Sequence, residues 1–230
     1  EKYGSKIIHV PADKQNAEYN KGVAVSHISN EILVMTDHDN ILPHPLWLQH
    51  MIQPLIDDPE IFGSGCLRFQ YDRSLTPLDR YFALMGATDP VAFFFNKSGH
   101  QSWLYDKFHL RATLLQDLPN YYIVKLNEYR LPALGGNGSV LRRKVLKFAN
   151  IDPEHFFHID IHVDIVKEGF TKYAFVKEEI RHLTNNNLGP FLARRKHFML
   201  KYHYSDQSKR RYSVYEPKKD KALLIGYLIY

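Results

Sequence analysis

The chain has few of the residues that disulfide-rich or membrane-spanning proteins use. Its single cysteine, Cys66, excludes an intrachain disulfide framework and a zinc site built from cysteines, and it favours a reducing compartment. No run of about 18 apolar residues is present, so nothing in the sequence clearly predicts a bilayer-spanning helix. The first residues contain no apolar region typical of a signal peptide, so we expect a cytoplasmic protein.

The composition is that of a packed domain with a basic tail. Of the 230 residues, 44% are hydrophobic and 13% aromatic, enough for a core. The net charge of +5 is uneven, because residues 190–221 hold ten Lys or Arg against three acidic residues, which leaves the remainder near −2. This argues against a nucleic-acid-binding core and suggests that the tail meets an acidic surface. We therefore divide the chain into a body, residues 1–189, and a basic, aromatic tail, residues 190–230.

The hydrophobic patterns predict an α/β fold. We expect strands over residues 5–10, 31–36, 61–69 and 173–176, and helices over 16–29, 47–56 and 159–168, the last ended by Gly169. Residues 134–146 indicate a glycine-rich turn followed by a strand and the start of a helix. Strand, helix and strand in succession is the unit of a parallel sheet. Residues 75–127 are irregular and rich in aromatics, and they receive no assignment. The apolar end, residues 221–230, fits the start of a membrane segment or an ordinary terminal helix.

Two carboxylates follow the strand that ends near residue 36. Asp37-His38-Asp39 is a D-x-D sequence at a strand end, where oxygen ligands for Mg²⁺ or Mn²⁺ and a bound phosphate are commonly placed. The alternatives are a solvated loop and a helix cap. Phosphohydrolases with an aspartyl nucleophile also use D-x-D, but the Asn40-Ile41-Leu42-Pro43 that follows disfavours that class. His182 is a further candidate metal ligand.

Two later stretches could complete a site. In Gly135-Gly136-Asn137-Gly138-Ser139, three glycines allow the backbone to approach a ligand, although a plain tight turn has the same composition. Asp160 and Asp164 lie four residues apart on one helix face, as do His158 and His162. A carboxylate here could act as a general base and the histidines could bind a metal, whereas an exposed polar face would look the same.

The order of these motifs resembles family-2 glycosyltransferases over roughly residues 5–185. The similar segments are Asn20-Lys21-Gly22, Thr36-Asp37-His38-Asp39, Pro45-Leu46-Trp47-Leu48, Asp58-Pro59-Glu60, residues 135–146, and residues 151–169. Two departures stand out. The first two strands of that family are absent before Glu1, and the usual Glu-Asp pair at the base position is replaced by Phe157-His158-Ile159-Asp160.

The resemblance implies a fold of the GT-A type, with a mixed, mostly parallel sheet flanked by helices and incomplete at its N-terminus. It implies inverting transfer of a sugar from a nucleotide-diphosphate donor to a hydroxyl of a glycan or glycolipid, assisted by Mn²⁺ or Mg²⁺. Asp39 and Asp37 would hold the metal and diphosphate, and Gly135, Gly136 and Asn137 would line the sugar or acceptor pocket. We assign the general base to Asp160, with Asp164 and His158 as alternatives.

Two further expectations accompany this assignment. The basic residues of the tail, Arg194-Arg195-Lys196 and Lys209-Arg210-Arg211, would lie against an anionic lipid surface on the cytoplasmic face of a membrane or against an anionic polymer. The rival hypothesis from another class is a non-catalytic module that binds a partner or a glycan.

Overall fold

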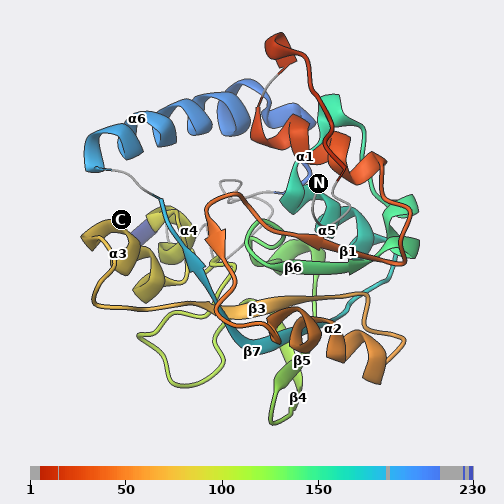
Figure 1. Ribbon diagram of the computed structural model, residues 1–230. Helices are drawn as coiled ribbons and strands as arrows, with labels where there is room; N and C mark the ends of the chain where they lie inside the picture. Colours follow the sequence, from red (N-terminus) through yellow and green to blue (C-terminus); the bar gives the residue numbers. More distant parts are fainter. Residues whose placement is uncertain (1–5, 15, 185–186, 213–224, 226–227, 230) are drawn as a thin grey trace.

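The computed structural model describes residues 6–14, 16–184, 187–212, 225 and 228–229 (Figure 1). The strands are β1 (Ile32–Met35), β2 (Asn40–Ile41), β3 (Gly63–Phe69), β4 (Thr113–Asp117), β5 (Tyr121–Lys125), β6 (Ser139–Arg142) and β7 (Lys172–His182). The α-helices are α1 (Ala17–Ser26), α2 (Trp47–Asp57), α3 (Pro77–Met85), α4 (Pro90–Phe94), α5 (His158–Lys167) and α6 (Leu188–Phe198). The α6 helix continues as a π-helix over Met199–Ser205, and short 3₁₀ turns cover Ala12–Lys14, Glu128–Arg130, Arg143–Phe148, Pro153–His155 and Gln207–Lys209.

The seven strands form one mixed sheet that is mostly antiparallel. Its order is β1-β6-β3-β7-β5-β4, with β2 paired to β7. Among the described strands only β3 and β7 pair in parallel, whereas all the other pairings are antiparallel. The prediction of a mostly parallel sheet of the GT-A type is therefore wrong.

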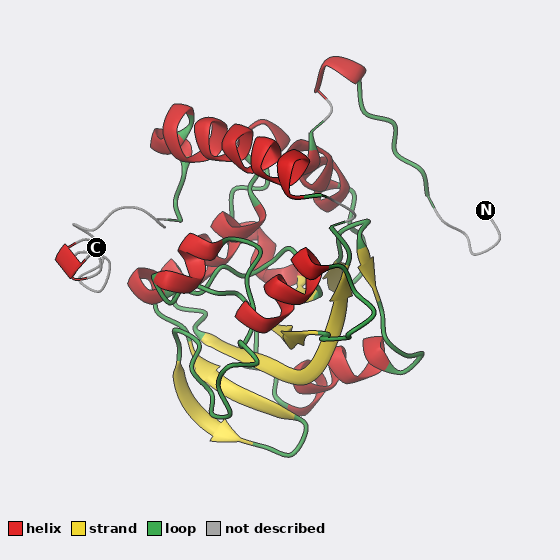
Figure 2. Cartoon of the chain, turned by 90° about the vertical axis from the view of Figure 1, so that its left-hand side faces the viewer, coloured by secondary structure: helices red, strands yellow, loops and turns green. Residues whose placement is uncertain are grey.

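Three features of the chain explain the error. Residues 6–11 form no strand, because this mostly exposed stretch leads away from the sheet and finds no partner strand there (Figure 2). The predicted strand after the glycine-rich turn is present as β6, but it inserts antiparallel between β1 and β3. The unassigned stretch contains the antiparallel hairpin of β4 and β5, which extends the sheet beyond β7.

The strand directions nevertheless place the carboxyl ends of several strands at one edge of the sheet. Because β6 runs antiparallel to both β1 and β3, those two strands point the same way, and β7 is parallel to β3. The carboxyl ends of β1, β3 and β7 therefore meet at the edge where β6 begins. Loops at such an edge are the usual place for a binding site in α/β proteins.

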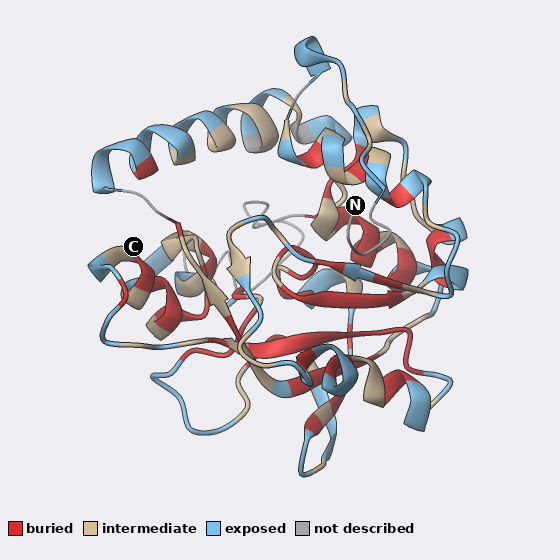
Figure 3. Ribbon diagram, viewed as in Figure 1, coloured by how far each residue is buried: buried red, intermediate tan, exposed pale blue. Residues whose placement is uncertain are grey.

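Side chains alternate between two hydrophobic layers, as a pleated strand requires. On one face of the sheet Leu141, Tyr173 and Phe175 pack with residues of α1 and α5. On the other face Val140, Ala174 and Val176 pack with Trp47, Met51 and Leu55 of α2 and with Ala83 of α3. The buried residues follow the central strands and the inward faces of these helices (Figure 3).

Local signals fix the helix ends that the sequence predicted. The side chain of Asn16 accepts a hydrogen bond from the backbone N–H of Tyr19 at 2.9 Å, which caps α1. Gly169, with φ of 91°, follows the end of α5, confirming the predicted stop. The apolar end of the chain, residues 221–230, lies almost wholly outside the described residues. Within the described part of the chain, no helix combines the length and apolar character needed to span a bilayer.

Candidate functional site

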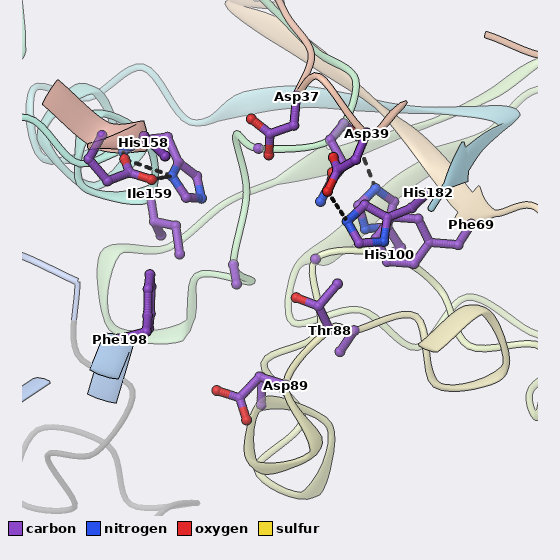
Figure 4. A pocket seen from close by; sticks show the side chains of 18 of the residues that line it. Asp37, Asp39, Phe69, Thr88, Asp89, His100, His158, Ile159, His182 and Phe198 are labelled. Carbon is purple, nitrogen blue, oxygen red and sulfur yellow. Dashed lines mark hydrogen bonds and ion pairs between the residues drawn. The ribbon is translucent and has the colours of Figure 1, made fainter. Parts of the chain in front are cut away.

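A pocket of about 310 Å³ with charged and apolar side chains in its walls opens at the carboxyl ends of β1, β3 and β7 (Figure 4). Segments distant in sequence contribute its walls: α1, the D-x-D turn, the segment from the end of α3 through α4 to residue 100, the glycine-rich turn, the start of α5, and α6. Six of the predicted site residues line it, namely Asp37, Asp39, Gly136, Asn137, His158 and His182. The structure thus brings together residues from four predicted motifs.

The D-x-D sequence forms a tight turn organised by Asn40. The side-chain oxygen of Asn40 accepts a hydrogen bond from the backbone N–H of Asp37 at 2.9 Å, and the backbone N–H of Asn40 donates to the carbonyl of Asp37 at 3.0 Å. The side-chain amide of Asn40 donates to Oδ1 of Asn137 at 2.9 Å. Asn40 therefore joins the D-x-D turn to the glycine-rich turn. The sequence offered Asn40 only as an argument against a phosphohydrolase.

Asp39 and His182 form the part of the pocket best suited to a divalent cation. Nε2 of His182 lies 3.5 Å from Oδ2 of Asp39. Oδ1 of Asp39 and Nδ1 of His182 are buried and have no hydrogen-bond partner among the described residues. Burial lowers the pKa of His182 in spite of the nearby carboxylates of Asp39 and Asp37, so the imidazole stays neutral and keeps a lone pair for a ligand. The carboxylate of Asp39 suits Mn²⁺ or Mg²⁺ and the imidazole of His182 adds a nitrogen donor, while Asp37 lines the same pocket.

Lys21 supplies a fixed positive charge beside Asp37. Its Nζ lies 2.7 Å from Oδ1 of Asp37 and 3.6 Å from Oε1 of Glu18. Burial alone would lower the pKa of Lys21, but these two carboxylates outweigh it and raise the pKa above its ordinary value. A permanently charged ammonium group therefore faces the pocket from α1.

His158 and Glu18 form a partly buried pair on the wall opposite Asp39. Nδ1 of His158 lies 2.9 Å and 3.0 Å from the two carboxylate oxygens of Glu18, and the backbone N–H of His158 donates to the same carboxylate at 3.0 Å. Burial would raise the pKa of Glu18, but the charge and hydrogen bonds of His158, together with Lys21, lower it to about 2. Glu18 is therefore a carboxylate at neutral pH and orients the ring of His158.

The second ring nitrogen of His158 points toward the glycine-rich turn. A Cβ placed on Gly136 would lie 3.3 Å from Nε2 of His158 and 3.6 Å from Oδ2 of Asp37. The backbone of Gly136 thus passes between the imidazole and the carboxylate, where a side chain would occupy the space of a ligand. Gly135, with φ of 110°, would carry a Cβ only 2.7 Å from the carbonyl oxygen of His158. Glycine at position 135 is therefore required by its positive φ and by the close backbone of His158, whereas at position 136 a small side chain would meet only the side chains of His158 and Asp37.

His100 and Phe69 form a third wall that the sequence did not reveal. The two rings stack with centroids 4.0 Å apart, and Nε2 of His100 lies 3.3 Å from the carbonyl oxygen of Asn137. Burial lowers the pKa of His100 to about 4, so the ring is neutral and holds the glycine-rich turn in place. His100 lies in the unassigned stretch of residues 75–127, and Phe69 ends the strand before it. Neither belongs to a sequence motif, so neither was predicted as a site residue.

The other candidates for the base lie outside this pocket. Asp160 is fully buried and accepts hydrogen bonds from the Arg210 side chain at 2.9 and 3.2 Å and from the backbone N–H of Tyr212 at 2.8 Å. Asp164 contacts Arg211 at 2.7 Å and accepts from the backbone N–H of Asn150 at 3.0 Å. Both carboxylates therefore hold neighbouring segments together.

His162 is a core residue. It is fully buried between the rings of Phe62 and Tyr173, and its Nδ1 lies 3.2 Å from the carbonyl oxygen of His158. Burial lowers the pKa of His162 to about 4. The ring of His158 contacts Glu18 instead, so the structure does not bring the two histidines together as a metal pair.

Comparison with known proteins gives no family for this chain. No protein-family model matches the sequence, and no curated protein matches it. The chemistry must therefore be argued from the pocket.

Proposed function

We propose that this chain transfers a sugar from a nucleotide-diphosphate donor to an acceptor hydroxyl, with inversion and with the help of Mn²⁺ or Mg²⁺. The observation that supports this proposal is the convergence of the D-x-D turn, the glycine-rich turn and a histidine–carboxylate pair on one pocket. A leaving diphosphate needs positive charge, and an acceptor hydroxyl needs a base. The pocket has residues for both requirements on opposite walls.

The diphosphate would lie on the side of Asp39 and His182. These residues, together with Asp37, would hold the divalent cation, which when bound neutralises charge that develops on the leaving diphosphate. The ammonium group of Lys21 adds a positive charge beside the proposed cation site, since its Nζ lies 2.7 Å from Oδ1 of Asp37. Displacement of Lys21 from Asp37 toward the phosphate would leave the carboxylate free for the cation.

His158 is the residue we propose as general base. Its Nδ1 faces Glu18, which fixes the ring, while Nε2 faces the space beside Gly136. Glu18 stabilises the imidazolium that forms when the acceptor proton moves to Nε2. Asp160, the first choice from the sequence, is already committed to Arg210 and Tyr212, so we propose for it a structural role.

Nucleotide release from a panel of nucleotide sugars tests the proposal. The full-length protein is incubated with each donor, an acceptor and Mn²⁺, and the wild type is compared with Asp39→Asn and His158→Gln. We expect His158→Gln to reduce release by about 100-fold or more, the usual contribution of a general acid–base group. Asp39→Asn should also reduce release, because it would weaken the hold on the divalent cation. His155→Gln is the matched control, because His155 also contacts a carboxylate, Asp152 at 2.9 Å, but on the surface. Equal activity of wild type, Asp39→Asn and His158→Gln would refute this mechanism.

The same assay separates the rival functions. A non-catalytic module would bind a donor in a Mn²⁺-dependent manner and release no nucleotide from it. A phosphohydrolase would cleave the diphosphate bond equally well without the acceptor and would give a sugar phosphate and a nucleoside monophosphate. The proposed transferase requires both donor and acceptor and forms a glycosidic bond.

The basic tail supports an anionic partner only in part. Arg210 and Arg211 form ion pairs with Asp160 and Asp164, and Lys209 pairs with Asp206. Arg194 and Lys196 of α6 are exposed, as are Leu188 and Leu192 on the same helix. We propose that α6 contacts an anionic lipid surface. Sedimentation with phosphatidylserine vesicles tests this contact, and undiminished binding after Arg194→Glu and Lys196→Glu would exclude it.

A further inference from the structure

A second group of metal-ligating side chains lies outside the pocket. Nε2 of His44 lies 2.9 Å from one carboxylate oxygen of Glu178, and Nδ1 of His50 lies 2.6 Å from the other. Among the described residues, these three form the group whose ligand atoms all lie within 4.8 Å of one another. None of the three lines the pocket that contains Asp39.

The surrounding structure holds these side chains in place. His44 lies in the turn between β2 and α2, His50 in the first turn of α2, and Glu178 on β7. Between the two histidines, Trp47 is completely buried and its indole N–H donates to the carbonyl oxygen of Glu179 at 2.8 Å. The start of α2 is therefore fixed against β7 at the position of the cluster. Such preorganisation lowers the cost of binding a ligand.

The neighbouring Lys177 does not compete with a cation for Glu178. Lys177, the neighbour of Glu178, turns to Asp117 at 2.7 Å and to the carbonyl oxygen of Leu118 at 2.6 Å. A hollow of about 210 Å³ adjoins His50 and Glu178 and is also lined by Gln53, Tyr121 and Lys177. His44 and His50 are partly exposed, with 37% and 45% of their side chains accessible, so an ion could reach them from solvent.

We propose that His44, His50 and Glu178 bind a Zn²⁺ ion. Two imidazoles and one carboxylate are a ligand set that Zn²⁺ uses, and the hollow leaves a fourth position for water or a small ligand. Zinc–ligand distances of about 2.0–2.1 Å place tetrahedral ligand atoms about 3.3 Å apart. The ring nitrogens of His44 and His50 lie 2.9 Å and 2.6 Å from Glu178, so they would move away from the carboxylate by about 0.4 Å and about 0.7 Å. The ion would join α2 to β7 and stabilise that junction. This site is independent of the proposed transferase chemistry.

Zinc binding by the metal-free full chain tests this assignment. Isothermal titration with Zn²⁺ measures affinity, and Co²⁺ absorption reports nitrogen and oxygen ligands in a tetrahedral arrangement. The variants are His50→Ala and Glu178→Gln, with His155→Ala as a control for a surface histidine beside a carboxylate and Asp39→Asn as a control for the pocket. Loss of a residue that only hydrogen-bonds to a metal ligand lowers metal affinity about tenfold or more. We therefore expect the Zn²⁺ affinity of both cluster variants to fall by more than about tenfold.

The controls determine how each result is interpreted. Retention of the zinc site in His155→Ala and Asp39→Asn, with weakened binding in both cluster variants, supports the assignment. No Zn²⁺ binding by the wild type overturns it. Unchanged binding in a folded His50→Ala variant also overturns it, and a loss in Asp39→Asn instead would place the zinc in the pocket. Because His50 is half-exposed, circular dichroism should show that its variant remains folded.

Discussion

Substitution of Asp160 by Asn separates a structural role from a catalytic one. Asp160 is fully buried, and Arg210, whose side chain is 7% exposed, forms two hydrogen bonds with it. The Asn side chain can still accept the hydrogen bond from the backbone N–H of Tyr212, but Arg210 loses its countercharge. Breaking a buried ion pair in this way costs about 3–5 kcal/mol. Asp160→Asn should therefore unfold at a much lower denaturant concentration than the wild type.

The magnitude can be measured and checked with a second variant. For a chain of this size each kcal/mol lowers the melting temperature by about 2–4 °C, so the expected decrease is roughly 6–20 °C. Adding Arg210→Met to Asp160→Asn removes the uncompensated charge and should restore much of the lost stability. Urea unfolding of the wild type, both single variants and the double variant gives the coupling free energy between the two positions.

Activity measurements complete this test. If Asp160 acts only through structure, folded Asp160→Asn molecules should retain much more activity than His158→Gln, and the double variant should recover activity along with stability. The contrary result is a variant that is as stable as the wild type but has lost nucleotide release. That result would refute our reasoning and return the role of general base to Asp160.

Three further predictions concern the pocket. Glu18→Gln should destabilise the protein at neutral pH, because the folded state lowers the pKa of Glu18 from 4.5 to about 2. This shift corresponds to about 3 kcal/mol of stability that is present above pH 4.5 and lost as the pH falls toward 2. The urea midpoint of the variant should therefore change less than that of the wild type across this pH range. Gly136→Ala should leave the melting temperature nearly unchanged but reduce turnover, because its Cβ would lie 3.3 Å from Nε2 of His158. Gly189→Ala should leave turnover unaltered, because a Cβ there would meet nothing within 4 Å among the described residues outside its own helix and chain neighbours. Removal of divalent cations with EDTA should abolish nucleotide release by the wild type, and added Mn²⁺ should restore it; release that persists in EDTA would contradict the metal role of Asp39.

The sequence predicted most local elements but not the connectivity of the sheet. The helices near residues 17–26, 47–57 and 158–167 and the strands over 32–35 and 63–69 were predicted, because their periodicity and end signals are local. A strand after the glycine-rich turn was predicted without exact bounds. Which strands pair is a long-range property. Nothing near β6 reveals that it will insert antiparallel between β1 and β3, and the β4–β5 hairpin lies in a stretch without clear patterning.

Several of the predicted site residues line one pocket for a geometric reason. A motif at the end of β1 and another just before β6 meet at the same edge, because the two strands are antiparallel neighbours. The reversed strand therefore brings Gly136 and Asn137 toward Asp37 and Asp39. The partners of these motifs were not predicted, since Glu18, Lys21 and His100 have no distinctive spacing relative to them.

The contacts of Asp160 also connect the tail to the proposed chemistry. Through Asp160, α5 holds Arg210, whose guanidinium carbon lies 3.1 Å from the centre of the Phe157 ring. Phe157 lines the pocket directly before His158, and it also packs against Phe198 and Tyr202 of the tail. The segment after residue 190 thus forms a wall of the pocket beside the proposed base. From the sequence, the charge of Arg210 appears free for an external partner. In the structure it holds that wall of the pocket in place.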